Sequence, residues 1–347
     1  MAFSVLAPHG ADAAKWSAVI DMLPLHLRDI HFTLEYAAAQ ELLGLKAKLA
    51  VYEWEGYVVV QPFALRLVKI SARDEVDICS LYGYGGPVSN HGHTLFAWFD
   101  EAFREWCGQS GVVCEFCALH PMLASHQLSL FRRMPSIKPI PRKEVVVMDL
   151  RGDFEAAYKD RRKAGIKAAR AAGIKVTAAS CTKDFARLYR ATMVRTGALA
   201  RWDFPDEYFD ALIEIGAVFY AKIGDHVESA ALMIYGYDTA YYHFAGNAME
   251  NPKACANDLL VHEMAKFARK QGPKWFHLGG GATSSPDDTV LHYKAGFTDR
   301  RETAYSYFRV FDDTAYRDLC FLKIGIEIVE TGAEFKSGFL PLYRREA

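Results

Sequence analysis

Three strand-like runs follow one another closely between residues 217 and 245, and they constrain the fold of this chain more than any other feature. The turns between them carry Gly224-Asp225 and Asp238, residue types that favour tight reversals of the backbone. Strands joined by such short turns run antiparallel. The sequence therefore predicts an antiparallel meander whose strands cover residues 217–223, 228–237 and 239–245.

A loop and a helix follow the meander. The loop spans residues 246–256 and the helix residues 258–270, with Asn257 or Asp258 as its N-cap and Gly272-Pro273 at its end. Three helices are expected before the meander, at residues 153–172, 183–196 and 204–215. Further elements are expected after it: a strand at 275–278, a glycine loop at 279–285, a short helix at 287–295 and a strand at 304–311.

The first half of the chain also mixes helices and strands. Helices are expected at residues 11–22, 32–43 and 94–107, and strands at 48–53, 57–68, 78–81, 112–119 and 144–150. Both halves share a loose order of strands, helix and strand, which hints at a diverged internal duplication. The fold class is therefore α+β, a mixed α/β chain.

Length and composition exclude several classes of protein. The 347 residues suggest about two domains, and 51% apolar residues exclude a wholly disordered chain. The net charge of −1 argues against a protein that coats nucleic acid, although a local basic site stays open. The most apolar stretch, residues 51–70, is broken by charges, so no membrane-spanning segment is expected. Seven scattered cysteines and the lack of a signal peptide indicate a reducing cytoplasm.

The start of the helix after the meander is the first candidate site. A helix N-terminus has unpaired N–H groups and a partial positive charge, which suit a phosphate. The small residues of segment 254–256 would let a ligand approach the backbone, and Lys253 adds a positive charge. The alternative is an ordinary surface loop before an ordinary helix.

The glycine loop is the second candidate. Gly279, Gly280 and Gly281 at a strand end permit positive φ angles and a close approach of the backbone. Downstream, Tyr293 could donate a proton and Lys294 could neutralise a phosphate or an oxyanion. The alternative is a tight turn, a core tyrosine and a solvated lysine.

Basic and histidine residues supply further candidates. Residues 159–170 form a basic helix face that would contact a polyphosphate or tRNA, or would simply be solvated. Strict strand alternation places His243 on one face with Tyr241 and Ala245, and Tyr242 and Phe244 together on the other face. His243 is then a general base or a buried structural histidine. His120, just past a strand, is open to the same two interpretations, a general base or a buried structural histidine. His91-Gly92-His93 lacks clear further ligands nearby, so no metal site is expected.

In their order, the elements from residue 217 to 311 resemble a GNAT-type acyltransferase domain. More specifically, the chain from about residue 48 onward resembles the FemAB-like branch, in which two such domains lie in tandem. The tail at residues 338–344 resembles those of relatives linked to surface-polysaccharide gene sets. The other supporting stretches are Tyr82-Gly83-Tyr84-Gly85-Gly86-Pro87, Arg161-Arg162-Lys163, Ala256-Asn257-Asp258-Leu259-Leu260, His277-Leu278-Gly279-Gly280 and Tyr293-Lys294-Ala295-Gly296-Phe297.

The resemblance implies two tandem GNAT-like domains, each a mostly antiparallel sheet flanked by helices. We expect a degenerate domain at residues 1–150, an acyltransferase domain at 151–320 and a C-terminal helix and tail at 321–347. The implied reaction moves an acyl or aminoacyl group from acyl-CoA or aminoacyl-tRNA to an amine of a cell-envelope precursor or a sugar nucleotide. The amine attacks directly, so no covalent enzyme intermediate forms.

The resemblance also suggests roles for individual residues. The catalytic set is His243 as base, Tyr293 as acid, and Lys294. The donor would contact Asn247, Lys253, Ala256, Asn257, Asp258 and Leu259. The acceptor would contact Tyr84, Gly85, Gly86, His120, Arg161, Arg162 and Gly280.

One departure from the family supports an alternative function. The usual GNAT donor loop carries Gln/Arg-x-x-Gly-x-Gly/Ala, and residues 251–256 lack its glycines. The alternative is a catalytically degenerate module that binds a nucleotide-sugar or a protein partner. Neither interpretation involves DNA or a metal, tRNA is a partner only if it is the donor, and the oligomeric state stays open.

Overall fold

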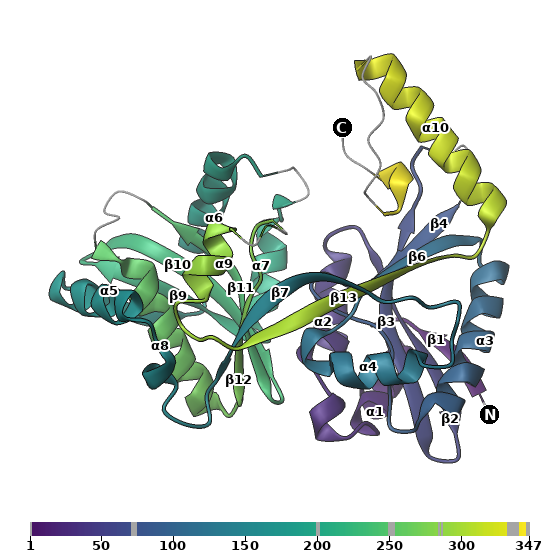
Figure 1. Ribbon diagram of the computed structural model, residues 1–347, viewed down its shortest axis with the longest axis horizontal. Coiled ribbons are helices and arrows are strands. Elements are labelled where there is room, and N and C mark those ends of the chain that lie inside the picture. Colours follow the sequence, from purple (N-terminus) through teal and green to yellow (C-terminus); the bar gives the residue numbers. More distant parts are fainter. Residues whose placement is uncertain are drawn as a thin grey trace. The chain divides into compact units, whose positions relative to one another are not determined.

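The computed structural model describes residues 2–70, 75–198, 202–248, 254–283, 285, 287–331 and 340–344. The chain forms two compact units (Figure 1). Unit 1 comprises residues 1–27, 31–142 and 304–347, and unit 2 comprises residues 28–30 and 143–303. Unit 1 is thus made of separate segments of the chain. The domains expected from the sequence, with boundaries at 150 and 320, are each one continuous segment.

Unit 1 is built on a mostly antiparallel sheet. Its strand order is β1 (Ala2–Leu6), β2 (Lys46–Trp54), β3 (Tyr57–Leu67), β4 (Val76–Cys79), β6 (Val112–Ala118) and β13 (Arg301–Val310), with β5 (Val88–Ser89) pairing β3. Among the strand pairs described in this unit, β4 and β6 alone form a parallel ladder, because the long helix α3 (His93–Gln109) lies between them in the chain. The shorter helices are α1 (Asp12–Asp21), α2 (Leu34–Glu41) and α4 (Ala124–Phe131). Aromatic residues of α3, among them Phe99 and Phe103, pack into the core.

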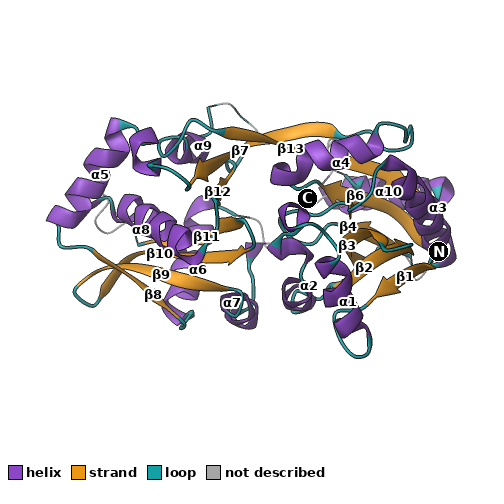
Figure 2. Cartoon of the chain, turned by 90° about the horizontal axis from the view of Figure 1, so that it is seen from below, coloured by secondary structure: helices purple, strands orange, loops and turns teal. Residues whose placement is uncertain are grey.

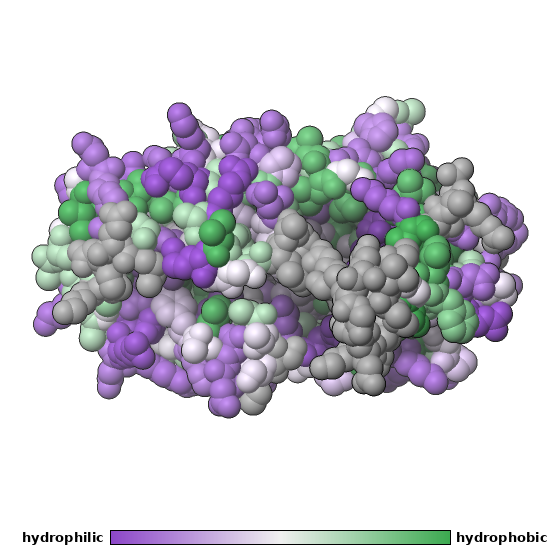
Figure 3. Space-filling model, turned by 90° about the horizontal axis from the view of Figure 1, so that it is seen from above, coloured by the Kyte–Doolittle hydropathy of each residue, from purple (hydrophilic) through white to green (hydrophobic). Residues whose placement is uncertain are grey.

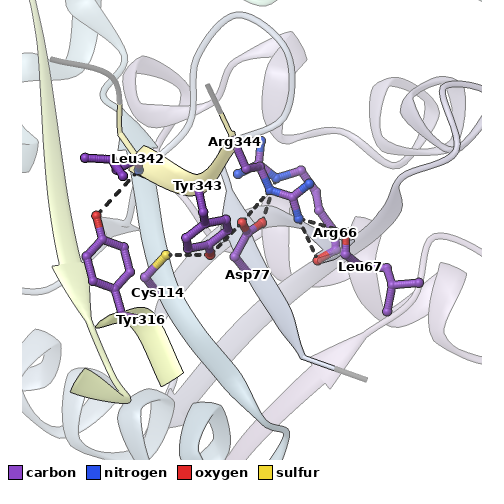
Figure 4. Close-up of polar contacts among 8 residues, drawn as sticks. All are labelled: Arg66, Leu67, Asp77, Cys114, Tyr316, Leu342, Tyr343 and Arg344. Carbon is purple, nitrogen blue, oxygen red and sulfur yellow. Dashed lines mark hydrogen bonds and ion pairs between the residues drawn. The ribbon is translucent and has the colours of Figure 1, made fainter. Parts of the chain in front are cut away.

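The C-terminal segment of unit 1, residues 342–344, is hydrogen-bonded to this sheet. After α10 (Asp313–Thr331), the 3-10 helix Leu342–Arg344 brings Tyr343 and Arg344 to the buried carboxylate of Asp77 on β4 (Figure 4). The Tyr343 hydroxyl donates to Asp77 Oδ2 at 3.0 Å, and Arg344 Nε donates to the same oxygen at 2.5 Å. Arg66 Nε donates to Asp77 Oδ1 at 2.8 Å. The Asp77 carboxylate therefore joins β4 to a segment that lies more than 260 residues downstream.

Unit 2 is also built on mostly antiparallel strands. Its strand order is β7 (Ile140–Asp149), β12 (Trp275–Gly279), β11 (Thr239–Asn247), β10 (His226–Gly236), β9 (Gly216–Ile223) and β8 (Lys175–Ala179). Helices α5 (Asp160–Ala171) and α8 (Ala256–Gln271) lie side by side (Figure 1, Figure 2) and share a core cluster with Met233 and Phe276. Helices α6 (Lys183–Thr196) and α7 (Asp206–Ile213) pack against β9–β11 through other residues, and α9 (Thr289–Lys294) follows the glycine loop.

A β-bulge interrupts the third strand of the meander. Leu232 of β10 pairs with Phe244, but its neighbour Met233 pairs with Tyr242, so His243 is the extra residue. Leu232 and Met233 point to opposite faces, and therefore Tyr242 and Phe244 do as well. Tyr242 packs against the α8 side of the core, and the Phe244 ring contacts the α6 residue Tyr189. The expected sharing of one face by Tyr242 and Phe244 was therefore wrong.

The predicted fold class is confirmed: the chain is a mixed α/β protein whose sheets are mostly antiparallel. The sequence analysis missed the edge strands β1 and β8, the short strand β5 and the helix α4. It expected a C-terminal helix within residues 321–347, and α10 begins earlier, at Asp313. No helix within the described residues has the length and apolar character needed to cross a membrane. On the face drawn in Figure 3, hydrophobic side chains lie in separate patches among hydrophilic ones.

Candidate active site

In unit 2, strands β11 and β12 pair at three positions only. Thr239, Ala240 and Tyr241 face Trp275, Phe276 and His277, and there the parallel ladder ends. A register shift then pairs Gly279 of β12 with Val146 of β7 on its other side. Strand β11 continues to Asn247, held by β10. Within the described residues, the β11–β12 ladder thus ends at Tyr241, six residues before the end of β11.

The corresponding strands of unit 1, β4 and β6, are followed by segments that remain hydrogen-bonded to each other. Beyond the last paired position of β4, Ser80 N donates to Phe116 O at 3.1 Å and Gly85 N donates to Ala118 O at 2.8 Å. Gly85 also forms a parallel bridge with Leu119. These bonds occupy main-chain groups that diverging strands would expose, so unit 2 carries the better candidate site.

Helix α8 begins close to the end of the β11–β12 ladder, because its residue Asn257 accepts a hydrogen bond from the hydroxyl of Tyr242. Its N-cap, Cys255, has a left-handed backbone with φ of 52°, and its side chain makes no capping bond. Ala256, Asp258 and Leu259 are buried, so their side chains face the protein. An acyl donor bound at the start of α8 could therefore contact mainly the main-chain atoms of Ala256, Asp258 and Leu259. Lys253 lies outside the described residues.

Asn257 is the centre of a polar network at the start of α8. Its Nδ2 donates to the Tyr293 hydroxyl at 2.8 Å. Its Oδ1 accepts from the hydroxyls of Ser229 and Tyr242, each at 3.1 Å. The Ser229 hydroxyl also lies 2.7 Å from Asn247 Oδ1. Strands β10 and β11, helix α8 and helix α9 are therefore tied together around the Tyr293 oxygen.

A buried ion pair supports Tyr293 from the other side. Arg162 of α5 bonds to the Asp258 carboxylate of α8, and its guanidinium lies over the Tyr293 ring, 4.6 Å from the centroid. Two glycines make room for the pair. A Cβ on Gly165 would lie 1.9 Å from Asp258 Oδ2, and one on Gly296 would lie 2.8 Å from Arg162 Cγ. Close approach, rather than a special backbone angle, therefore requires glycine at these positions.

Burial controls the protonation of this cluster. It raises the pKa of the Tyr293 hydroxyl well above its usual value, and the nearby Asp258 charge adds to the effect. The Tyr293 oxygen therefore carries its proton at neutral pH. Burial also raises the pKa of Asp258, while the Arg162 guanidinium acts in the opposite direction.

Lys294 follows Tyr293 and turns to the glycine loop. Its Nζ donates to the carbonyl of Gly280 at 2.7 Å. Burial lowers the pKa of the ammonium to about 7, with Lys143 adding to the fall and Asp288 opposing it. Gly279, which has φ of 79°, bends the chain here, and its N–H donates to His277 Nδ1 at 3.1 Å. At neutral pH the Lys294 amine is therefore divided between its charged and neutral forms.

The basic helix face is partly a packing face. Arg162 is 7% exposed and bonds to Asp258, and Arg170 pairs with Glu263 of α8 at 3.1 Å. Arg161, Lys163 and Lys167 are exposed. The acidic partners of Arg162 and Arg170 lie 96 and 93 residues further along the chain. The sequence around residues 159–170 therefore gives no sign that these arginines are paired.

The predicted acceptor residues of unit 1 lie together. The His120 N–H donates to Gln127 Oε1 at 2.9 Å, and Gln127 Nε2 donates to Gly85 O at 2.8 Å. The Tyr84 and His120 rings are 5.5 Å apart. A Cβ on Gly86, which has φ of 88°, would lie 2.7 Å from Leu119. Gln127 thus fixes the turn against the segment that follows β6.

The structure groups the predicted residues of unit 2 into two clusters. Asn247, Asn257, Asp258, Arg162 and Tyr293 form one, and Gly280 with Lys294 forms the other. His243 lies at the bulge with its ring against Phe244. Sequence reasoning missed Ser229, Tyr242 and Lys143. The hairpin register could have revealed Ser229, because this residue lies directly opposite Asn247.

Comparison with known proteins identifies the architecture. Residues 156–295 match the family described as acetyltransferase (GNAT) domain. No curated protein is found as a sequence relative of the chain. Among solved structures, FemX is similar with a TM-score of 0.70 at 14% identity, covering 91% of this chain and 99% of FemX.

Two further solved structures share the fold. The C-terminal domain of a putative lysylphosphatidylglycerol synthetase from Agrobacterium fabrum has a TM-score of 0.56 at 13% identity, over 86% of this chain and 93% of that one. A tandem GNAT protein from the clavulanic acid biosynthesis pathway has a TM-score of 0.52 at 9% identity, over 89% and 99%. At such identities the likeness concerns the fold alone.

Proposed function

We propose that the protein transfers an acyl or aminoacyl group to an amine, because residues 156–295 match the acetyltransferase (GNAT) domain family and a tandem GNAT protein shares the fold. The observation that carries this proposal is the early end of the β11–β12 ladder at Tyr241, beside Tyr293 and the start of α8. A carbonyl placed there would meet main-chain N–H groups that stabilise a developing oxyanion.

The proposed reaction needs no covalent intermediate. The acceptor nitrogen attacks the donor carbonyl carbon, the bond from that carbon to the carrier oxygen or sulfur breaks, and an amide forms. The attacking amine loses a proton to His243 or to water, and Tyr293, which is protonated at neutral pH, gives a proton to the leaving group. Lys294 in its ammonium form would stabilise the negative charge of a phosphate-bearing carrier.

The donor class is acyl-CoA or aminoacyl-tRNA, and both carry phosphates. We propose that the carrier lies along the start of α8, near Asn247, Lys253 and the main chain of segment 256–259, with Asn257 orienting Tyr293. The proposed acceptor is an amine of a cell-envelope precursor or a sugar nucleotide in the cytoplasm. Arg161 and Gly280 of unit 2 are its proposed contacts, and the acceptor roles of Tyr84, Gly85, Gly86 and His120 stay predictions from the sequence. Arg162, bonded to Asp258, is proposed as a positioning residue.

Ligand-induced stabilisation tests the donor class. A donor that binds the folded protein raises its melting temperature. Acetyl-CoA, longer acyl-CoAs and an aminoacyl-tRNA are compared, with desulfo-CoA and uncharged tRNA as controls. Transfer is then measured with the stabilising donor, labelled in its acyl group, and an amino-sugar nucleotide. The proposal predicts label in the acceptor for wild type and for Lys270→Met, and strongly reduced label for Tyr293→Phe.

A second candidate function is supported by the missing glycines of segment 251–256. A degenerate module would bind a nucleotide-sugar or a protein without turnover. It predicts stabilisation by the acceptor alone, no stabilisation by either donor class, and no labelled product. This set of results would replace the transferase proposal.

A further inference from the structure

The Ser229 hydroxyl of strand β10 lies between two side-chain amides of unit 2. Its Oγ is 2.7 Å from Asn247 Oδ1 at the end of β11 and 3.1 Å from Asn257 Oδ1 at the start of α8. Ser229 is 1% exposed, so these amides rather than bulk water are its neighbours. A hydroxyl has a single hydrogen to donate, and Ser229 can therefore serve only one of the two oxygens at a time.

The amide that does not receive this hydrogen must bond to Ser229 in the opposite direction. A side-chain amide has an acceptor oxygen and a donor nitrogen, and a half-turn about the Cβ–Cγ bond exchanges their positions. The second amide therefore donates from its Nδ2 to Ser229 Oγ. Asn247 and Asn257 thus have two paired orientations, and the change from one to the other needs no movement of the backbone.

The two paired orientations differ at the Tyr293 hydroxyl. When Ser229 donates to Asn257 Oδ1, Asn257 Nδ2 donates to the Tyr293 oxygen at 2.8 Å, and the Tyr293 hydrogen points away from Asn257. When Ser229 donates to Asn247 instead, Asn257 presents Oδ1 to Tyr293 and accepts that hydrogen. The Tyr242 hydroxyl, 3.1 Å from Asn257 Oδ1, can donate or accept, so it fits both orientations.

We propose that Ser229 is a positioning residue that couples Asn247 to the direction of the Tyr293 hydroxyl. This inference rests on the proposed function, in which Asn247 contacts the donor and Tyr293 protonates the leaving group. A donor that offers an N–H group to Asn247 Oδ1 turns Asn247 Nδ2 towards Ser229 and leaves the Tyr293 hydrogen available. A donor that offers only acceptor oxygens there has the opposite effect. The coupling therefore favours a carrier that presents an amide N–H to the end of β11.

Carbon NMR of tyrosine tests the direction of the bond at Tyr293. The protein is labelled at the tyrosine ζ-carbon, whose chemical shift differs between a hydroxyl that donates and one that accepts. The Tyr293 signal is assigned by its absence in Tyr293→Phe. Asn257→Asp at about pH 8 supplies the reference shift, because a carboxylate only accepts and so takes the Tyr293 hydrogen. We expect Asn247→Asp to move the signal in the same direction, because a carboxylate there takes the Ser229 hydrogen.

Variants of Ser229 test whether the coupling passes through its hydroxyl. In Ser229→Ala, Asn247→Asp should no longer move the Tyr293 signal, whereas Ser229→Thr should retain the response. Asn247→Leu leaves the Ser229 hydrogen to Asn257 and should not reproduce the shift of Asn247→Asp. Ser306→Ala, at a buried serine of β13, should leave the signal and the response unchanged. Where transfer is measured, Asn247→Asp should lower kcat about five- to tenfold, the factor of one net hydrogen bond, and Ser229→Ala should remove this loss.

The inference and the proposed function fail in different ways. An Asn247→Asp shift of equal size with Ser229 and in Ser229→Ala, or no shift in either, would overturn the coupling whether or not transfer occurs. A shift that depends on the Ser229 hydroxyl, in a protein without any transfer, would retain the coupling and remove the enzyme assignment.

Discussion

Arg162 and Asp258 form a buried ion pair that joins α5 to α8. A buried carboxylate that loses its partner is left uncompensated in a medium of low polarity. We therefore expect Arg162→Met to lower the free energy of unfolding by about 3–5 kcal/mol. Urea unfolding measures the change, and Lys163→Met on the exposed side of α5 serves as the matched control.

A double variant separates the ion pair from packing. Arg162→Met combined with Asp258→Leu removes both charges, so its loss of stability should be smaller than that of Arg162→Met alone. A double variant that is less stable than the single one would show that the pair is not the main contribution of Arg162.

Tyr293→Phe should affect turnover far more than folding. The phenyl ring stays under the Arg162 guanidinium, but the hydroxyl that Asn257 holds is lost. We expect kcat to fall by about 10²–10⁴-fold, the usual range for removal of a general acid, with a small change in melting temperature. Tyr235→Phe, elsewhere in the same core, should retain the kcat of wild type. Equal kcat values for both variants would remove Tyr293 from the chemistry.

The charge on Lys294 predicts the pH dependence of transfer. Its pKa is about 7, so the ammonium form is lost as the pH rises through this value. With a phosphate-bearing donor, kcat/KM should therefore fall between pH 6.5 and 8 by roughly the factor that one titrating group gives. Lys294→Arg keeps a positive charge throughout and should flatten this limb of the profile. A limb that persists unchanged in Lys294→Arg would assign it to another group.

Folding stability should respond to pH with the opposite sign. The folded-state pKa of Lys294, about 7, lies below its ordinary value of 10.5. Between these values the unfolded chain binds more protons, so this residue makes the folded state more stable as the pH rises from about 7 to about 10.5. Urea unfolding at pH 7 and 9.5 should show a larger gain for wild type than for Lys294→Met. The same gain in both would contradict the assigned shift.

The C-terminal contact with Asp77 predicts a local loss of stability. Tyr343 is 3% exposed and bonds to Asp77, so Tyr343→Ala leaves a cavity and removes a buried hydrogen bond. We expect a loss of about 3–5 kcal/mol, the range for buried aromatic residues. Hydrogen exchange should increase first in β4 and β6. Exposed Tyr57→Ala is the control, and uniform exchange across both units would argue against a local effect.

Local patterns predicted most of the elements, because helices and inner strands depend on nearby residues. The meander, α8 and the glycine loop were found from periodicity and turn residues. Strand β8 was missed because its residues are mostly exposed and lack an apolar face. The facing of Tyr242 and Phe244 was wrong because a single-residue bulge at His243 breaks an alternation that the sequence alone suggests.

The candidate site was only partly accessible from the sequence, because its contacts are long-range. Tyr293 and Lys294 could be proposed from their residue types near the glycine loop. The Arg162–Asp258 pair spans 96 positions, and its acidic member gives no sign of its partner. Lys143 stands in a strand of unremarkable composition, and only the return of β7 beside β12 brings it to Gly280.

The discontinuity of unit 1 has a consequence for biosynthesis. Residues 304–310 of its strand β13 and the segment that holds Asp77 are translated after every residue of unit 2. On the ribosome, the sheet of the nascent first unit therefore keeps an unfinished edge while the second unit acquires all its strands. The part of the protein that is synthesised first is completed last, so an early stop codon near the 3′ end of the message would damage the amino-terminal half.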